Sequence, residues 1–360
     1  MPDYHGNGSR NERSSMKIIH GGDIYRNHVK LDFSVNVNPL GVPEAVKEAL
    51  HEAVEDCGKY PDIAQVQLKK AVGNMLKVPE ESLLFGNGAS ELLLACVRGI
   101  RPERTVIPVP SFYGYEYAAG AVGGNIFYYQ TKKEDRFCPG KDFLSALTKE
   151  TSLLFLANPG NPAGNLLNRE YLRGLLSHCR EKGIYVILDE CFIEFCGGDN
   201  SMQREAEEFE NLILVRAFTK IFAIPGVRLG YLICGSRQLL EKIKRQLPEW
   251  NISGFAQAAG SVCAMQKSYL DKTADYVAKE RSFLADGLKK NGITVISGEA
   301  NFLLVYSEAD LYEKLLKKGI LIRDCKNFRG LKKGFYRIAV RNRKENEMLL
   351  KAAGEINWEK

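Results

Sequence analysis

Short apolar runs rich in β-forming residues alternate with helix-like segments along most of this chain, and this alternation restricts the folds that it can adopt. Strands that are separated by helices usually pair in parallel within one sheet. Ligands of such sheets gather at the carboxyl ends of the strands. The order therefore predicts an α/β domain whose mixed, mostly parallel sheet is flanked by helices. The runs that carry this prediction are SLLF (82–85), RTVIPV (104–109), GNIFYYQ (124–130), SLLFLANP (152–159), IYVILDE (184–190), LILVRAF (212–218) and LGYLIC (229–234).

The regions on either side of these runs predict further elements. The segment PEAVKEALHEAVEDCG begins with a proline and carries apolar residues at helical spacing, so it predicts an amphipathic helix over 43–58. The pattern turns helical from 241 to 292, and the strand-like runs ITVIS, NFLLVYS, GILIR and FYRIAVR follow it. We therefore expect an N-terminal arm and substrate loop over 1–40, a large domain over 41–265 and a smaller α+β domain over 266–360.

Composition excludes several classes of protein. With 45% apolar and 26% charged residues, the chain is typical of globular enzymes. A net charge of +6 is too evenly spread to indicate a nucleic-acid partner, but it suits a small anionic substrate. No apolar run approaches the roughly 18 residues that a membrane span needs. The nine cysteines are scattered and form no CxxC pair, so we expect reduced thiols in a cytoplasmic protein and no metal site.

Three strand ends carry residues that can serve chemistry. GNGAS (86–90) is a glycine-rich turn between a strand and a helix, where backbone N–H groups can bind phosphate. Taken alone, a plain strand-to-helix turn explains GNGAS equally well. The loop in FLANPGNPAG presents the side-chain amide of Asn161, and the strand VILDE ends at Asp189. That carboxylate needs a partner from elsewhere in the chain unless it is capped or solvated.

The segment FTKIFAIPGVRLGYL (218–232) places Lys220 and Arg228 around a Pro-Gly turn between two apolar runs. A charge at the join of buried elements is costly unless it is paired or chemically used. A solvated lysine is the ordinary alternative for Lys220. The occurrence of all four segments in this order is far more specific than any one of them.

Together these segments resemble the fold-type-I enzymes that use pyridoxal phosphate (PLP), the aspartate aminotransferase superfamily. The resemblance rests on TKxxxxPGxRLG, NPxNPxG, the strand-end aspartate and the upstream GNG. It implies the fold of the PLP-dependent transferases, a covalent bond between Lys220 and the cofactor, and binding of the cofactor phosphate by Arg228. Asp189 would keep the ring nitrogen protonated, so that the ring can accept electrons.

The same resemblance implies further cofactor contacts. Asn161 would donate to the phenolate oxygen of the cofactor, and Phe112, in VPSFYGY, would stack on its ring unless it is simply a core aromatic. Tyr60, in KYPD, resembles the tyrosine that reaches the cofactor phosphate of a neighbouring subunit, which implies a homodimer with shared active sites. Many relatives carry a hydroxyl residue where this chain has Ala217, so one phosphate contact is missing. The remaining implied contacts are Gly88, Ala89, Ser90 and Thr219.

The two ends of the chain indicate which reaction occurs. HGGDIY (20–25), LDFSVNVNPLG (31–41), GILIRDCKNFRGL (319–331) and FYRIAVR (335–341) resemble the L-threonine-O-3-phosphate decarboxylases of cobalamin biosynthesis. This resemblance implies that Arg337 binds the substrate carboxylate and that Arg323 binds its distal phosphate. His20, Asn36 and Arg341 are further candidates for substrate binding. The alternatives are a turn residue for His20 and an exposed strand-end charge for Arg341, while loop architecture explains Asn36 equally well.

The predicted activity is PLP-dependent decarboxylation of O-phospho-L-threonine to (R)-1-aminopropan-2-ol O-phosphate, for the cobalamin side chain. Histidinol-phosphate aminotransferase is the first alternative, because it shares the core motifs and the C-terminal arginine, although it usually lacks the HGG start. An O-phosphoserine decarboxylase is the second, since its substrate differs by one methyl group. A PLP-binding regulator is the third, and the short polar N-terminal arm disfavours it. We expect a small phosphorylated amino acid as substrate, and no nucleic-acid or membrane partner.

Overall fold

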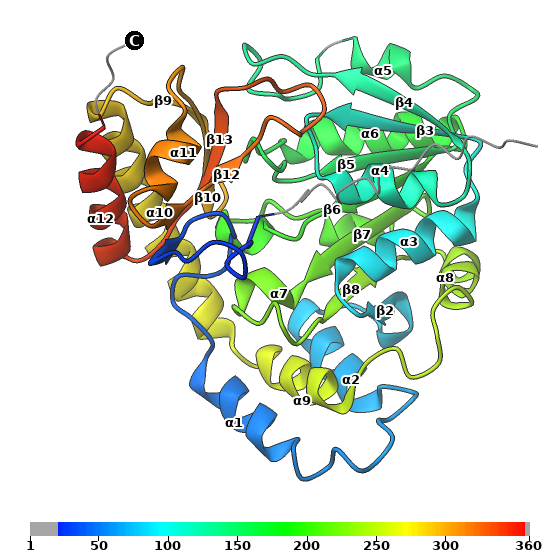
Figure 1. The fold of residues 1–360 in the computed structure, drawn as a ribbon. Coiled ribbons are helices and arrows are strands. Elements are labelled where there is room, and N and C mark those ends of the chain that lie inside the picture. The colour runs from blue at the N-terminus through cyan, green and yellow to red at the C-terminus, as the bar shows by residue number, and fades with distance from the viewer. Residues whose placement is uncertain (1–20, 141, 357–360) are drawn as a thin grey trace, which may run out of the picture.

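The computed structural model describes residues 21–140 and 142–356, and its largest element is a seven-stranded sheet with the order β2-β8-β7-β6-β5-β3-β4 (Figure 1). Only β8 runs against the other strands of this sheet, because it pairs antiparallel with both of its neighbours. The predicted mixed, mostly parallel sheet is therefore confirmed. Its strands are β2 (Leu83–Gly86), β3 (Arg104–Val109), β4 (Asn125–Gln130), β5 (Leu153–Ala157), β6 (Tyr185–Asp189), β7 (Leu212–Ala217) and β8 (Gly230–Ile233).

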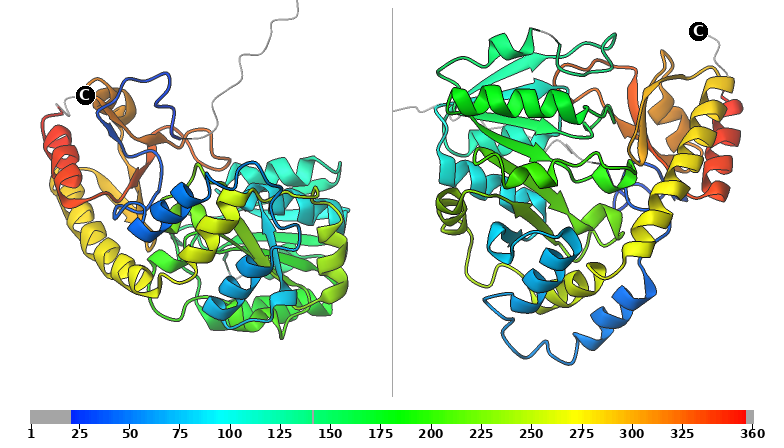
Figure 2. Two further views of the ribbon diagram at one scale, coloured as in Figure 1. Left: turned by 90° about the horizontal axis from the view of Figure 1, so that it is seen from below. Right: turned by 180° about the vertical axis from the view of Figure 1, so that it is seen from behind.

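Helices cover both faces of this sheet (Figure 2). Successive side chains of a strand point to opposite faces. On β5, Leu153 and Phe155 belong to one apolar cluster, and Leu154 and Leu156 belong to another. Since both faces are buried, the strands read as continuous apolar runs. The first cluster includes α3 (Ala89–Ile100), α4 (Tyr113–Gly120) and α8 (Arg237–Lys244), and the second includes α2 (Val66–Leu76), α6 (Arg169–Glu181) and α9 (Gly254–Cys263).

A smaller antiparallel sheet, with the order β12-β13-β10-β9, lies beside the large one (Figure 1). The long helix α10 (Lys267–Lys290) contacts β9, β10 and α12 of this smaller unit, and it also contacts η2 (Ile193–Phe195), which follows β6. It therefore connects the two units. The other elements of the smaller unit are β9 (Thr294–Ser297), β10 (Phe302–Tyr306), α11 (Leu311–Leu316), β12 (Arg323–Asp324), β13 (Phe335–Ala339) and α12 (Arg343–Gly354). The short helices of the large unit are α1 (Glu44–Glu52), η1 (Glu80–Ser82), α5 (Phe143–Ala146), η3 (Gln203–Ala206) and α7 (Phe218–Ile221).

The N-terminal segment joins the smaller unit rather than the large sheet. β1 (Leu31–Asp32) pairs in parallel with β11 (Ile320–Leu321). The backbone N–H of Phe33 donates to the Leu321 carbonyl at 2.7 Å, and its carbonyl accepts from Ala339 at 2.9 Å. Residues far apart in the sequence thus form one wall beside the large sheet.

Two predicted elements differ in the structure. The helix predicted over 43–58 ends at Glu52, and the following residues form single turns. Because Val54 is 50% exposed and Cys57 is also exposed, this stretch has no packed face to stabilise another helical turn. The run GILIR forms two short strands instead of one, since β11 pairs with β1 and β12 pairs with β13.

We propose that the large domain spans 41–265 and the smaller domain 266–360, with 1–40 as the N-terminal arm. The start of α10 at Lys267 supports this division. In the part of the chain that the structure describes, no helix is both long enough and apolar enough to cross a membrane.

A buried ion pair holds the carboxyl ends of β6 and β7 together. Arg216, which is 4% exposed, donates from Nη2 and Nε to Glu190 Oε2 at 2.9 and 3.1 Å, and Glu190 is fully buried. Glu190 also accepts hydrogen bonds from the Ser201 hydroxyl and the Met202 backbone N–H, both at 2.7 Å. Removing one partner would therefore leave an uncompensated buried charge.

We expect Arg216→Met to lower the free energy of unfolding by about 3–5 kcal/mol, because it leaves the buried Glu190 charge alone. The double variant Glu190→Gln/Arg216→Met should recover part of this loss, since it removes both charges of the buried pair, while the 3.8 Å contact between Arg216 and Glu194 is still lost. Urea denaturation of the two variants and of the parent protein measures the difference. Equal losses in the single and double variants would contradict this account of the pair.

Candidate active site

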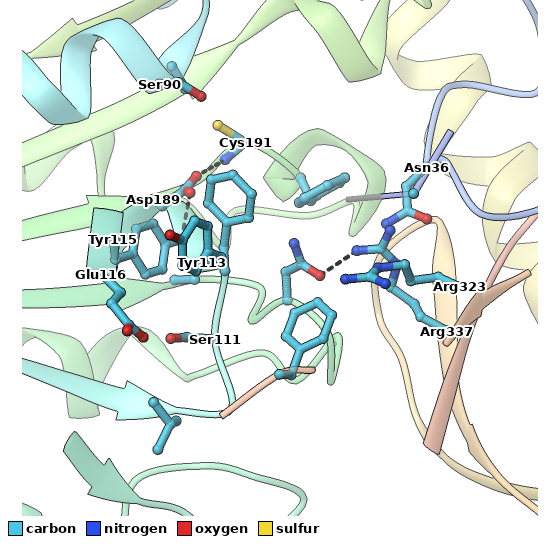
Figure 3. A pocket seen from close by; sticks show the side chains of 18 of the residues that line it. Asn36, Ser90, Ser111, Tyr113, Tyr115, Glu116, Asp189, Cys191, Arg323 and Arg337 are labelled. Atoms are coloured by element: carbon cyan, nitrogen blue, oxygen red, sulfur yellow. Dashed lines mark hydrogen bonds between the residues drawn. The ribbon is translucent and has the colours of Figure 1, made fainter. Parts of the chain in front are cut away.

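A cavity of about 820 Å³ opens between the carboxyl ends of the large sheet and the smaller sheet (Figure 3). Its walls come from the ends of β5, β6 and β7, from the starts of α3 and α4, from the N-terminal segment, and from β12, β13 and the loop between them. The location agrees with the rule that open α/β sheets bind ligands beyond the carboxyl ends of their strands. Asp189 and Tyr115 lie on one side of the cavity, and Arg323, Arg337 and Asn36 lie on the other (Figure 3).

Asp189 is the last residue of β6, and its carboxylate is held by two donors. Tyr115 Oη donates to Oδ2 at 2.6 Å, and the backbone N–H of Cys191 donates to Oδ1 at 2.9 Å. Asp189 is 9% exposed and lines the cavity. It can therefore act as a fixed anionic acceptor at the end of the central strand.

Lys220 lies in α7, the short helix that begins where β7 ends. Phe218 and Ile221 anchor this helix in the core, and Thr219 and Lys220 line the cavity. Burial lowers the pKa of Lys220 to about 8, and the positive charges of Arg337 and Arg228 act in the same direction. An amine of such pKa is a better nucleophile at neutral pH than a solvated lysine.

The GNGAS turn and the Arg228 segment form a close backbone contact. Gly88 has φ of +79° and precedes the first turn of α3, where Ala89 and Ser90 line the cavity. A Cβ on Gly88 would collide with the guanidinium of Arg228, and a Cβ on Gly230 would lie 2.7 Å from the Ala89 nitrogen. Both glycines are therefore required for the start of α3 to meet the start of β8.

Arg337, on β13, connects the smaller sheet to two other segments. Its Nη1 donates to Asn161 Oδ1 at 2.6 Å, and its Nη2 donates to the Ser34 carbonyl at 2.9 Å. Among the described residues, no carboxylate forms an ion pair with Arg337, and its Nε has no hydrogen-bond partner. Burial lowers its pKa to about 10, and the charge of Arg323 adds to this shift.

Arg323, on β12, lies directly opposite Arg337 in the antiparallel pair. It donates to the Asp324 carbonyl at 2.7 Å and to Asn327 Oδ1 at 2.8 Å, and burial lowers its pKa. Asn36 lines the same side of the cavity, and its buried Oδ1 has no partner among the described residues. This side of the cavity is therefore strongly positive.

The loop between β12 and β13 completes the cavity wall. Arg329 donates to Glu116 of α4 at 2.8 Å, and its guanidinium lies 4.0 Å from the ring centre of Tyr128. Lys326 also lines the cavity and pairs with Asp324 at 3.0 Å. The loop thus connects the smaller sheet to α4 and β4.

The residues of the cavity fit PLP. Lys220 supplies an amine of lowered pKa for a covalent bond, and Asp189 supplies a fixed carboxylate for a ring N–H. Since Asn161 Oδ1 already accepts from Arg337, the remaining polar group of that amide is a donor, as a phenolate oxygen requires. The first turn of α3, with Arg228 against Gly88, suits a phosphate.

The structure brings most of the predicted site residues to this cavity. Those that line it are Asn36, Ala89, Ser90, Phe112, Asn161, Asp189, Thr219, Lys220, Arg228, Arg323 and Arg337. Gly88 adjoins it through its contact with Arg228.

Two predicted residues, Arg341 and Tyr60, do not line the cavity. Arg341 pairs with Glu345 at 3.2 Å and does not line the cavity. It lies beyond the C-terminal end of β13, whereas Arg337 lies within that strand and faces Arg323. Tyr60 is 84% exposed and packs on Trp250, with ring centres 5.2 Å apart. His20 lies outside the described residues.

Sequence reasoning missed Tyr115, although its hydroxyl touches Asp189. The stretch FYGYEY contains three tyrosines in five positions, and they point in different directions on a helix. Glu116, Lys326 and Arg329 were missed as well, because they read as ordinary surface charges. No group of three or more His, Cys, Asp or Glu side chains suited to a metal ion occurs within the described ranges.

Comparison with known proteins agrees with this arrangement. A sequence model of the family described as "Aminotransferase class I and II" matches residues 28–353. The threonine-phosphate decarboxylase of Salmonella typhimurium (strain LT2) is 34% identical over 330 residues, with 91% of each chain covered. The adenosylcobalamin biosynthesis bifunctional protein CobDQ of Leptospira interrogans is 32% identical over 94% of this chain and 41% of that longer protein. The crystal structure of the histidinol-phosphate aminotransferase from Clostridium acetobutylicum has a TM-score of 0.85 and 34% identity, over 90% of this chain and 98% of that one.

These matches extend over both sheets and over almost all of the cavity wall. The likeness therefore includes the parts of the chain that carry Lys220, Asp189 and both cavity arginines. This chain belongs to the class I and II aminotransferase family, the fold-type-I enzymes that use pyridoxal phosphate.

Proposed function

We propose that this protein is a PLP-dependent carboxy-lyase that converts O-phospho-L-threonine to (R)-1-aminopropan-2-ol O-phosphate. The observation that carries the proposal is the facing pair of Arg323 and Arg337 at the cavity. Like charges directly opposite each other on antiparallel strands are destabilising. Burial and mutual repulsion already lower the pKa of Arg337 to about 10. A ligand with two anionic groups relieves this repulsion, and a phosphorylated amino acid carries a carboxylate and a phosphate.

The two arginines divide these groups between them. Arg337 is the nearer to the predicted cofactor, because it touches Asn161, so we assign it to the carboxylate. Arg323 is left for the distal phosphate, with Asn36 and Lys326 on the same wall. A planar guanidinium can bind either group through two parallel hydrogen bonds, which a lysine cannot do.

The related proteins support the choice of substrate and pathway. The Salmonella relative is named a threonine-phosphate decarboxylase, and the Leptospira relative is named for adenosylcobalamin biosynthesis. On this basis we assign the amine phosphate product to the side chain of cobalamin.

In the proposed mechanism, the chain positions the substrate and controls two protons. When bound, PLP would accept the electron pair that stays on Cα when the carboxylate leaves as carbon dioxide. Arg337 and Arg323 would fix the substrate at both ends and so determine which of the bonds at Cα is presented for cleavage. Asp189 keeps the proton on the ring nitrogen. Lys220, whose pKa of about 8 permits proton exchange near neutral pH, returns a proton to Cα.

We include a homodimer with shared active sites in the proposal. Tyr60 and Trp250 pack on each other at a surface that also exposes Ile63 and Val66, each more than half exposed. Clustered exposed apolar side chains are typical of protein interfaces. In such a dimer, Tyr60 reaches the cofactor phosphate of the other subunit. We place the protein in the cytoplasm, a location that its nine free cysteines support.

Histidinol-phosphate aminotransferase activity is the second candidate. The Clostridium structure, which carries that name, favours it through its TM-score of 0.85. Its substrate also has a phosphate for Arg323, but transamination needs a 2-oxo acid acceptor and returns the proton to the cofactor instead of to Cα.

The first test is to incubate the PLP-loaded protein with O-phospho-L-threonine and without any 2-oxo acid. We expect many turnovers of carbon dioxide and amine phosphate, measured by a coupled carbon dioxide assay and by mass spectrometry. Lys220→Ala should abolish this turnover, because the covalent bond to the cofactor and the proton for Cα are both lost. Absence of release, with activity on histidinol phosphate once 2-oxoglutarate is added, would overturn the decarboxylase assignment.

Arg323→Ala should raise KM for O-phospho-L-threonine about tenfold to hundredfold, the effect of losing a charge-assisted hydrogen bond to phosphate. The dissociation constant of PLP should change much less, since Arg323 does not adjoin the Gly88 turn. Steady-state kinetics and a PLP titration compare the two constants. Arg180→Ala, an exposed arginine of α6, is the matched control. A KM that stays at the parent value would remove Arg323 from the phosphate site.

The lowered pKa of Lys220 predicts a pH-dependent labelling pattern in the protein freed of PLP. Only the neutral amine reacts with trinitrobenzenesulfonate, so labelling of Lys220 should be half-maximal near pH 8. Ordinary lysines reach that point near their usual pKa of about 10.4. Arg337→Met removes a nearby positive charge and should move the midpoint for Lys220 to higher pH. Peptide mapping of the labelled protein follows each site. A midpoint for Lys220 equal to that of surface lysines would refute this prediction.

A further inference from the structure

The hydroxyl of Tyr115 makes a buried contact with Asp189 that the mechanism above does not use. The hydroxyl donates to Asp189 Oδ2 at 2.6 Å, and the tyrosine is 1% exposed. Hydrogen bonds between a hydroxyl and a carboxylate are short and are roughly twice as strong as those between neutral groups. This contact is therefore one of the stronger interactions of the cavity.

Aromatic packing fixes the position of the Tyr115 ring. The ring stacks on Phe155 of β5, with centres 5.1 Å apart and planes 9° apart. The Phe112 ring packs against it edge to face, with centres 5.6 Å apart and an angle of 84°. Since β5 pairs with β6, this packing fixes the Tyr115 hydroxyl relative to the strand that ends at Asp189.

The two oxygens of Asp189 receive donors of different kinds. Oδ1 accepts from the backbone N–H of Cys191, which belongs to the same turn, and Oδ2 accepts from a side chain on another helix. The Cys191 contact remains in any variant that keeps the backbone, so Tyr115 is the donor that can be removed on its own. Burial and the Asp189 charge raise the pKa of Tyr115 well above that of an ordinary tyrosine, so its proton stays on the phenol at neutral pH.

We propose that Tyr115 is a positioning residue for Asp189, which orients the carboxylate toward the cofactor ring nitrogen so that the proton remains on that nitrogen. The inference rests on the proposed use of PLP, but it does not depend on which bond of the substrate breaks. A carboxylate that accepts two hydrogen bonds is held in one orientation. Without the phenol, only the Cys191 backbone N–H holds the Asp189 carboxylate, which can then turn away from the ring nitrogen and hold its proton less firmly.

The test is the 15N resonance of ring-labelled PLP bound to the protein, compared between the parent and Tyr115→Phe. Phenylalanine keeps the stack on Phe155 and removes only the hydroxyl. We expect the resonance to move downfield, toward its position in an unprotonated ring, and the dissociation constant of PLP to rise about tenfold. Tyr117→Phe removes an exposed hydroxyl from the same helix and should leave the resonance unchanged.

The outcomes separate this inference from the proposed function. A parent resonance typical of a protonated ring that is identical in Tyr115→Phe would overturn the role of Tyr115, whatever happens to stability. A thermal unfolding curve that shifts while the resonance does not would also overturn it, since Tyr115 would then be only structural. Failure of the parent protein to bind labelled PLP at all would instead refute the proposed function. A resonance shift in Tyr115→Phe, together with no shift in Tyr117→Phe, would establish the positioning role.

Discussion

The burial of the Arg337 guanidinium is the constraint on which the site depends. A charge that is 8% exposed must be compensated by hydrogen bonds, and those of Arg337 come from two separate segments. The Ser34 carbonyl belongs to the N-terminal segment, and the Asn161 amide belongs to the loop after β5. Three parts of the chain that are distant in sequence therefore meet at one side chain, and the cavity exists only where they meet.

Arg337 connects two sides of the cavity that would bind different groups. The cationic side of the cavity, with Arg323 opposite Arg337, belongs to the smaller sheet. The side with Lys220 and Asp189 belongs to the ends of β7 and β6. Because Asn161 contacts Arg337 directly, a group bound at the arginine and a group bound at the large sheet act on the same amide. The chemistry proposed above needs this coupling, since substrate orientation decides which bond breaks.

Much of this could be predicted from the sequence, because the residues concerned lie in local patterns. The apolar runs gave the strands of the large sheet, and GNGAS, NPGNP, VILDE and TKIFAIPGVRLG gave the strand-end residues that line the cavity. The rest depends on contacts between distant segments. The helix over 43–58 was too long, since no tertiary packing supports its last turns. Arg341 does not line the cavity, and the sequence alone did not reveal its local ion pair with Glu345. Tyr115 was missed because only the fold shows which of three tyrosines faces Asp189.

The pairing of β1 with β11 also has a mechanical consequence. It fastens the segment that carries Ser34 and Asn36 to the same unit that carries Arg323 and Arg337. The same segment is also bonded to the large unit, because the backbone N–H of Asn38 donates to the Lys220 carbonyl at 3.0 Å and the Asn38 side chain donates to the Ile221 carbonyl at 2.7 Å. A shift of the smaller unit about α10 would therefore pull on α7 through this segment. The anion-binding wall and the reacting amine are thus mechanically linked in this fold.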